Sequence, residues 1–142
     1  MTQSAFAHTD VTELIIKGYY RVYNELGYGF LEKVYENAMS IALRKLGLTV
    51  VQQSQIDVYF DGEVVGEYAA DLLANNLVIV ELKAARTLNP DHDAQLLNYL
   101  KATRYEVGLL LNFGVKPEIK RKAFSKDRKG SLSWTEPPTK HA

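Results

Sequence analysis

The chain has 142 residues, of which 46% are hydrophobic and 24% are charged, a composition typical of a folded globular domain rather than a disordered or fibrous chain. The 17 Lys and Arg residues balance the 17 Asp and Glu residues, so any binding to nucleic acid must come from a local patch. The absence of cysteine excludes disulfides, thiolate metal sites and cysteine nucleophiles.

The same features predict where the protein works. A chain without cysteine fits a reducing compartment. The sequence has neither a signal-peptide pattern nor an apolar run of the roughly 20 residues that span a membrane. We expect one cytoplasmic domain over residues 1–142, without membrane contact, whose ends at 1–9 and about 125–142 are flexible.

Two amphipathic helices are predicted first. Apolar residues recur at three- and four-residue spacing over residues 11–26 and again over residues 31–46, which is the period of a helix with one buried face. In the second helix, Glu32 and Tyr35 lie three residues apart on adjoining parts of one face. We expect Glu36, the residue that follows Tyr35 on the helix, to be solvated.

Three strands follow, because the apolar period changes to two. Residues 51–60 and 63–74 flank Asp61-Gly62, a strong hairpin signal. Residues 77–83 form the third strand, and its Leu-Val-Ile-Val run predicts a central strand that is covered on both faces. The turn before it is Asn75-Asn76.

The last part of the chain predicts a strand–helix–strand unit. Asn89 is a suitable N-cap for a helix that begins at Pro90 and ends near Thr103. An apolar strand follows at residues 106–113, and residues 119–124 are a candidate edge strand. A right-handed crossover would make the third and fourth strands parallel. The predicted fold class is therefore α/β, an α+β mixed sheet of three antiparallel strands and a parallel fourth, with helices packed against it.

Three charged residues stand out in the apolar second and third strands. Asp71 lies on the second strand, and Glu81 and Lys83 lie near the end of the third. A buried charge is costly unless a partner, water or a metal ion compensates it. Two carboxylates and a lysine at a strand end are also what a magnesium-dependent site that cleaves phosphodiesters needs.

The loop between these strands decides whether the two carboxylates meet. A two-residue loop at Asn75-Asn76 would pair Asp71 with Val80 and send Asp71 and Glu81 to opposite faces. A single metal ion does not readily bind carboxylates on opposite faces of a sheet. We therefore predict either a three-residue loop or a β-bulge near Asp71.

Several stretches resemble a known family. Residues Gly29-Phe30-Leu31-Glu32-Lys33-Val34-Tyr35 match the signature of the bacterial GxxExxY protein family, which is similar to the PD-(D/E)XK nuclease superfamily with its restriction-endonuclease-like core. The similarity runs from about residue 10 to 122, although Ala70 stands where the superfamily often has proline. The other matching stretches are Ala70–Leu73, Val80–Lys83, Gln95–Leu100 and Gly108–Gly114.

The resemblance implies a metal-dependent nuclease site. It implies that Asp71, Glu81 and Lys83 fill the acidic and lysine positions of the superfamily, with Glu32 and Gln95 as the polar residues of the two core helices. Mg²⁺ or Mn²⁺ would then take oxygen ligands from Asp71, Glu81, the Leu82 carbonyl and Glu32. We expect a DNA or RNA substrate, and its candidate binding residues are Tyr35, Tyr99, Lys116, Lys120, Arg121 and Lys122.

Two other functions remain open from the sequence. The fold is also compatible with a catalytically inactive module that binds nucleic acid or a protein partner. The third reading is a regulatory or interaction protein that forms a homodimer through its N-terminal helices, which a neutral net charge permits.

Overall fold

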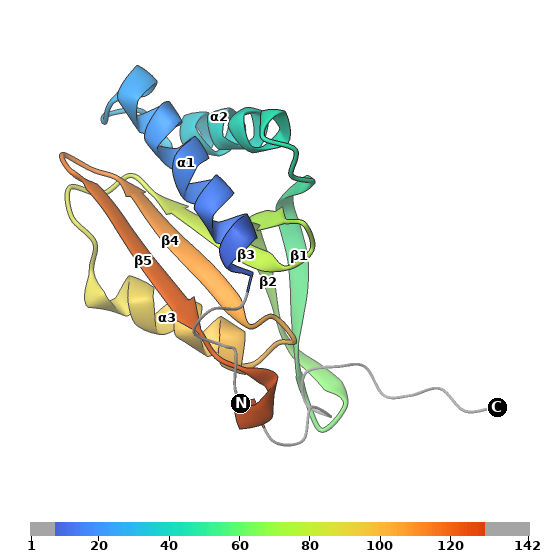
Figure 1. The fold of residues 1–142 in the computed structure, drawn as a ribbon. Coiled ribbons are helices and arrows are strands. Elements are labelled where there is room, and N and C mark those ends of the chain that lie inside the picture. Colours follow the sequence, from blue (N-terminus) through green and yellow to red (C-terminus); the bar gives the residue numbers. More distant parts are fainter. Residues whose placement is uncertain (1–7, 130–142) are drawn as a thin grey trace.

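The computed structural model describes residues 8–129 (Figure 1). The expected flexible ends at 1–7 and 130–142 lie outside the described residues, whereas Ser125 is buried and the chain keeps regular structure beyond it. The elements are α1 (Thr9–Leu26), α2 (Glu32–Lys45), β1 (Val50–Phe60), β2 (Glu63–Ala74), β3 (Val78–Lys83), α3 (Pro90–Lys101), β4 (Val107–Phe113), β5 (Pro117–Ala123) and the 3-10 helix η2 (Lys126–Lys129).

The five strands form one mixed sheet in the order β1-β2-β3-β4-β5. All neighbouring strands are antiparallel except β3 and β4, which are parallel. This confirms the predicted sheet, including the parallel crossover and the central position of β3. Within residues 8–129, no helix is long and apolar enough to cross a membrane.

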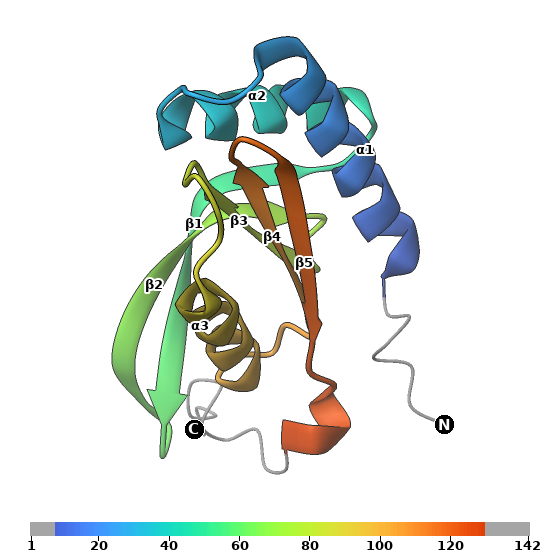
Figure 2. The same ribbon diagram turned by 90° about the vertical axis from the view of Figure 1, so that its left-hand side faces the viewer.

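The helices cover the two faces of the sheet (Figures 1 and 2). Ile15 of α1 and Met39 and Leu43 of α2 pack in the larger core. Leu96 and Leu100 of α3 pack in the smaller core on the other face. Every residue of β4 is buried, as expected for a strand that is covered on both faces. At the start of α3, the predicted cap is present, because the Asn89 side chain accepts a hydrogen bond from the Asp91 amide at 2.8 Å.

The β1–β2 hairpin extends beyond the rest of the sheet (Figure 2). Its far end exposes apolar side chains, among them Phe60 and Val65. Between Lys45 and Lys83 the sequence has no Lys or Arg, so the hairpin is an acidic projection. Its carboxylates away from Asp71 are Asp57, Asp61, Glu63 and Glu67.

Tyr35 is a core residue and does not line a substrate site, so that prediction is wrong. Its side chain is fully buried, and its ring stacks on Phe113 with centroids 4.0 Å apart. The hydroxyl donates to the Gly27 carbonyl at 2.7 Å and accepts from the Phe30 amide at 3.2 Å. Tyr35 therefore fixes the connection between α1 and α2.

We predict that Tyr35→Phe lowers the free energy of unfolding by about 1–2 kcal/mol, because the buried hydroxyl loses two hydrogen bonds while the ring stack remains. Urea denaturation measures the change. Tyr20→Phe is the matched control, since Tyr20 is 43% exposed. Equal stability of the Tyr35→Phe protein and the parent protein would contradict the prediction.

Candidate active site

Asp71 and Glu81 lie opposite each other where β2 and β3 separate. The ladder between the two strands begins with Ala74 paired with Val78, so the loop has three residues, 75–77. Continuing the same register places Asp71 across from Glu81. This confirms the first of the two predicted alternatives, a three-residue loop, and it brings the two carboxylates together.

Each carboxylate accepts a hydrogen bond from the backbone of the other strand. The Asp71 amide donates to Glu81 Oε2 at 2.9 Å, and the Leu82 amide donates to Asp71 Oδ2 at 2.8 Å. The amide and the carbonyl of an extended residue leave the strand on the same side, so the Leu82 carbonyl also faces β2. The two side chains thus take the place of ladder bonds as the strands diverge.

The backbone bends beside Asp71. Gln53 of β1 has a left-handed backbone with a φ of 51°, a conformation that costs a residue with a side chain on the order of 1 kcal/mol. In β2, Ala70 packs in the core beneath α3, whereas Leu72 packs in the core beneath α1 and α2. Residues two apart in a regular strand share a face, so β2 switches faces at Asp71.

Glu36 of α2 is joined to this site through Gln53. The Gln53 amide group donates to Glu36 Oε1 at 2.7 Å and to Asp71 Oδ1 at 3.3 Å. Gln52 Nε2 and Lys33 Nζ donate to the other Glu36 oxygen at 2.8 and 2.9 Å. The Glu36 carboxylate is therefore held by three side chains at the edge of the site.

The prediction that Glu36 is solvated is wrong. Glu36 is only 5% exposed, whereas Glu32, one turn earlier, has an exposed side chain. Glu36 precedes Met39 and Ser40 by three and four residues, and both are buried. This spacing is the signal that could have identified Glu36 as the inward-facing carboxylate of the helix.

Glu81 and Lys83 leave β3 on the face that α3 covers. The neighbouring residues Val80 and Leu82 pack in the opposite core, and side chains alternate along a strand. The expectation that Glu81 and Lys83 share a face therefore agrees with the packing of β3.

Two stacked tyrosines link α3 to Glu81. The rings of Tyr68 on β2 and Tyr99 on α3 lie 3.5 Å apart and nearly parallel, and Gln95 Nε2 donates to the Tyr99 hydroxyl at 3.4 Å. The buried Tyr68 hydroxyl faces Glu81 but makes no hydrogen bond of good geometry within the described residues. Gln95 and Tyr99 thus belong to the surroundings of Glu81, and Tyr68 is a member that the sequence did not suggest.

Burial and like charge perturb both carboxylates. Burial, followed by repulsion from Asp71, raises the pKa of Glu81 to about 7. Burial also raises the pKa of Asp71, although hydrogen bonds from Leu82 and Gln53 oppose that shift. Burial would raise the pKa of Glu36 as well, but its three hydrogen bonds outweigh burial and lower that pKa.

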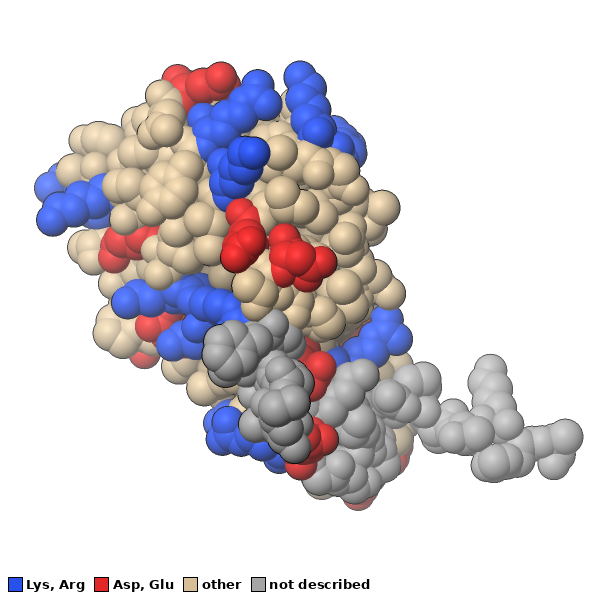
Figure 3. Space-filling model, viewed as in Figure 1, with Lys and Arg blue, Asp and Glu red and all other residues tan. Residues whose placement is uncertain are grey.

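The predicted basic residues do not form one surface. On β5, Ile119 packs in the α1–α2 core, so Arg121 shares that face while Lys120 and Lys122 project to the other. Lys122 Nζ lies 3.7 Å from Asp93 Oδ2. Figure 3 shows Lys and Arg interspersed with Asp and Glu over one side of the molecule, without a continuous basic face.

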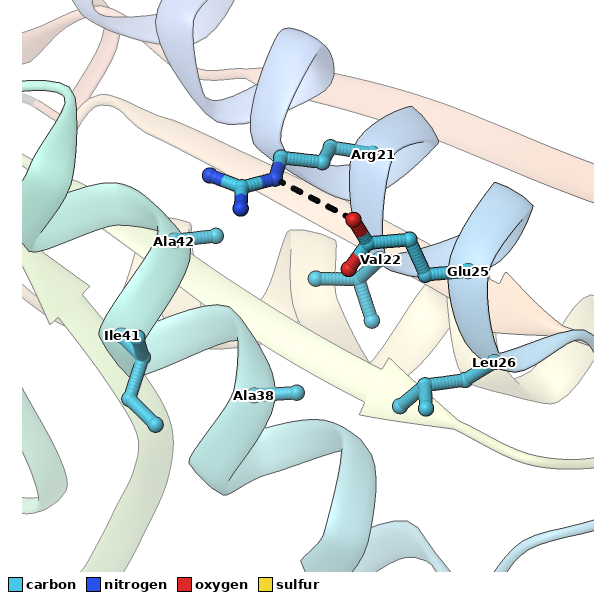
Figure 4. A pocket seen from close by; sticks show the side chains of 7 residues that line it. All are labelled: Arg21, Val22, Glu25, Leu26, Ala38, Ile41 and Ala42. Atoms are coloured by element: carbon cyan, nitrogen blue, oxygen red, sulfur yellow. Dashed lines mark ion pairs between the residues drawn. The ribbon is translucent and has the colours of Figure 1, made fainter.

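A hollow between α1 and α2 does not have the groups that phosphate chemistry needs. It holds about 200 Å³, and Figure 4 shows Arg21 and Glu25 side by side at its rim, where Arg21 Nε lies 3.8 Å from Glu25 Oε1. The side chains that complete the lining are apolar: Val22, Leu26, Ala38, Ile41 and Ala42. The candidate active site is therefore the Asp71–Glu81 group.

The donors of this group fit a hard divalent cation. Among the described residues, no three His, Asp or Glu side chains are arranged as a metal cluster. The site offers two facing carboxylates and the Leu82 carbonyl, and Mg²⁺ typically binds one or two carboxylates and keeps several waters. Burial first, and a neighbouring carboxylate second, raise the pKa values of Asp71 and Glu81, and a bound cation would favour the charged form of both groups.

A family model of the PD-(D/E)XK nuclease superfamily matches residues 9–122. The chain belongs to this superfamily. The match confirms the superfamily expected from the sequence and includes Asp71, Glu81 and Lys83, and the sheet agrees with a restriction-endonuclease-like fold. The narrower GxxExxY assignment stays a prediction. The curated proteins and the solved structures with which the sequence was compared gave no match.

We predict that Glu81 makes the metal-free protein less stable as pH rises. The folded chain keeps the Glu81 proton up to a pKa of about 7, whereas the ordinary value is 4.5. Below pH 4.5 both states are protonated, so the free energy of unfolding falls as pH rises from about 4.5 to 7. At about 1.4 kcal/mol per pKa unit, the loss is on the order of 2–3 kcal/mol.

Urea denaturation in EDTA across this pH range tests the effect. Relative to the parent protein, Glu81→Gln should gain stability as pH rises, because the amide keeps an acceptor for the Asp71 amide without the charge. The control is Glu67→Gln, an exposed glutamate on the neighbouring strand β2, and it should follow the parent. Parallel curves for the parent and Glu81→Gln would contradict the prediction.

Proposed function

We propose that the protein is a divalent-metal-dependent nuclease that hydrolyses phosphodiester bonds in DNA or RNA. The observation that carries the proposal is the pairing of Asp71 with Glu81, each bound to the backbone of the other strand, with Lys83 on the same face of β3 as Glu81. Superfamily membership supports this reading.

In this proposal the strand residues hold the metal. Asp71, Glu81 and the Leu82 carbonyl are the ligands for Mg²⁺ or Mn²⁺. When bound, the cation polarises the scissile phosphate and lowers the pKa of a coordinated water. Glu36, through Gln53, is the helix carboxylate joined to this group, and it takes the part that the family resemblance implied for Glu32.

The other residues act on the water and the phosphate. Lys83 carries a positive charge beside the carboxylates, where it orients the attacking water and offsets charge that develops on the phosphate in the transition state. Gln95 and Tyr99 supply hydrogen-bonding groups from α3 near the same water or substrate. A cytoplasmic location and a homodimeric state accompany this proposal as expectations.

We predict that Asp71→Asn, Glu81→Gln and Lys83→Ala each reduce cleavage by roughly 100-fold or more. Each substitution removes either a charged metal ligand or the positive charge that acts on the reacting phosphate. Purified protein is incubated with labelled single- and double-stranded DNA and RNA in Mg²⁺ or Mn²⁺. Glu67→Gln, on β2 but outside the site, should keep parental activity.

Three other outcomes separate the alternatives. Cleavage that persists in both the Asp71→Asn and the Glu81→Gln proteins would come from a contaminant and would reject the proposal. Salt-sensitive binding of nucleic acid without turnover would identify a non-catalytic module. A protein that binds neither Mn²⁺ nor nucleic acid in titrations would instead be an interaction protein.

We also predict that Mg²⁺ raises the melting temperature of the parent protein at pH 8 and has little effect on an Asp71→Asn, Glu81→Gln double variant. A ligand that binds only the folded state stabilises it by mass action, and the double variant lacks both carboxylates. Differential scanning fluorimetry with a Mg²⁺ titration measures this. Equal shifts in the two proteins would contradict the assigned ligands.

A further inference from the structure

A hollow with two cationic residues lies where the segments that follow β3 and β4 meet. It holds about 330 Å³, compared with the roughly 30 Å³ that one water molecule occupies in the liquid. Arg86 comes from the loop after β3, and Lys116 comes from the turn between β4 and β5. The complete lining is Arg86, Thr87, Val115, Lys116, Pro117 and Glu118.

The parallel pairing of β3 and β4 brings these loops to the edge where the site lies. Lys83 pairs with Asn112 near the ends of the two strands, so the segments that follow emerge together. Figures 1 and 2 show the loop before α3 running beside the β4–β5 turn. Arg86 is only three residues beyond Lys83, and three residues span at most about 11 Å.

A buried polar network fixes the loop after β3. Asn112 is fully buried, and its side chain accepts from the Ala85 amide at 3.0 Å and donates to the Ala85 carbonyl at 3.0 Å. It also donates to Glu118 Oε1 at 2.9 Å, and the same oxygen accepts from the Leu88 amide at 3.1 Å. These bonds occupy one oxygen of the only carboxylate in the hollow's lining.

Helix α1 holds the β4–β5 turn, which forms the other wall of the hollow. The Tyr19 hydroxyl donates to the Asn112 carbonyl and accepts from the Glu118 amide at 3.1 Å. The Tyr23 hydroxyl lies 2.7 Å from the Gly114 carbonyl oxygen. The walls also touch directly, because a Cβ at Gly114 would lie 2.5 Å from a backbone oxygen of the loop after β3. Arg86 and Lys116 are therefore carried on two rigidly connected segments.

The charges of the hollow suit a phosphate group. Arg86 and Lys116 both have exposed side chains, and a guanidinium and an ammonium are the usual partners of phosphate oxygens. The acidic β1–β2 hairpin offers no such partner, since no Lys or Arg lies between Lys45 and Lys83. Arg86 and Lys116 thus offer cationic partners to a polyanion at the Asp71–Glu81 group, on the segments that follow β3 and β4.

We propose that the Arg86–Lys116 pocket binds a phosphate group of the nucleic-acid strand, within a few nucleotides of the bond that the Asp71–Glu81 group cleaves. The inference rests on the proposed nuclease function. The short distance from Lys83 sets the spacing, because each strand of a duplex carries one phosphate per about 3.4 Å of axis. The bound group is either an internal backbone phosphate or a terminal 5′-phosphate.

The test measures binding apart from cleavage. Fluorescence anisotropy with a labelled DNA oligonucleotide, in Glu81→Gln protein that does not cleave, compares Arg86→Ala/Lys116→Ala with the unmodified pocket over a range of salt. We expect roughly tenfold weaker binding and a salt slope smaller by about 1.4–1.8, which corresponds to two lost phosphate contacts. The charge-matched control, Arg44→Ala/Lys45→Ala at the far end of α2, should change neither quantity.

A 5′-phosphorylated and a 5′-hydroxyl oligonucleotide distinguish the two sources of phosphate. A preference for the phosphorylated end that the pocket variant loses identifies a terminal phosphate, and equal affinity for both oligonucleotides identifies an internal one. With the parental site, the pocket variant should raise KM and leave kcat unchanged.

Equal effects of the pocket and control variants would overturn the pocket and leave the nuclease proposal standing. A protein that binds no oligonucleotide at all would overturn both proposals.

Discussion

Two carboxylates of like charge lie side by side where β2 and β3 part, and each is bound by a backbone amide of the opposite strand. These bonds satisfy amides that the sheet ladder no longer reaches. They also fix Asp71 and Glu81 relative to each other, so the divergence of the strands and the geometry of the site have one cause. Glu36, Gln53 and the tyrosines of the α3 side are arranged around this junction.

The junction is costly to the fold. Two half-buried carboxylates repel each other, and Gln53 holds a left-handed backbone beside them. Such strain persists only where the surrounding structure determines it, and it concentrates at functional sites. The protein bears this cost on rigid strands between two well-packed cores. A divalent cation would offset part of this cost, because its positive charge would neutralise the two carboxylates.

The elements and sheet order followed from periodicity, because apolar spacing changes sharply between the helical and the strand segments. The pairing of Asp71 with Glu81 followed from register. Periodicity placed Tyr35 on the apolar face of α2 but could not show that Glu36 is buried too, since adjacent residues on a helix turn by about 100° and the buried face of α2 is wide enough to include both. Gln53 carried no signal, because its contribution comes from a backbone bend that depends on tertiary packing.

The length of the three-residue loop between β2 and β3 constrains the fold and the site together. Its Asn75 and Asn76 both adopt positive φ, which asparagine tolerates but does not require uniquely. Its length, however, sets which face every residue of β3 presents. Among related chains, this loop should therefore vary in composition but rarely in length, because one inserted or deleted residue would displace the core and the acidic pair in the same step.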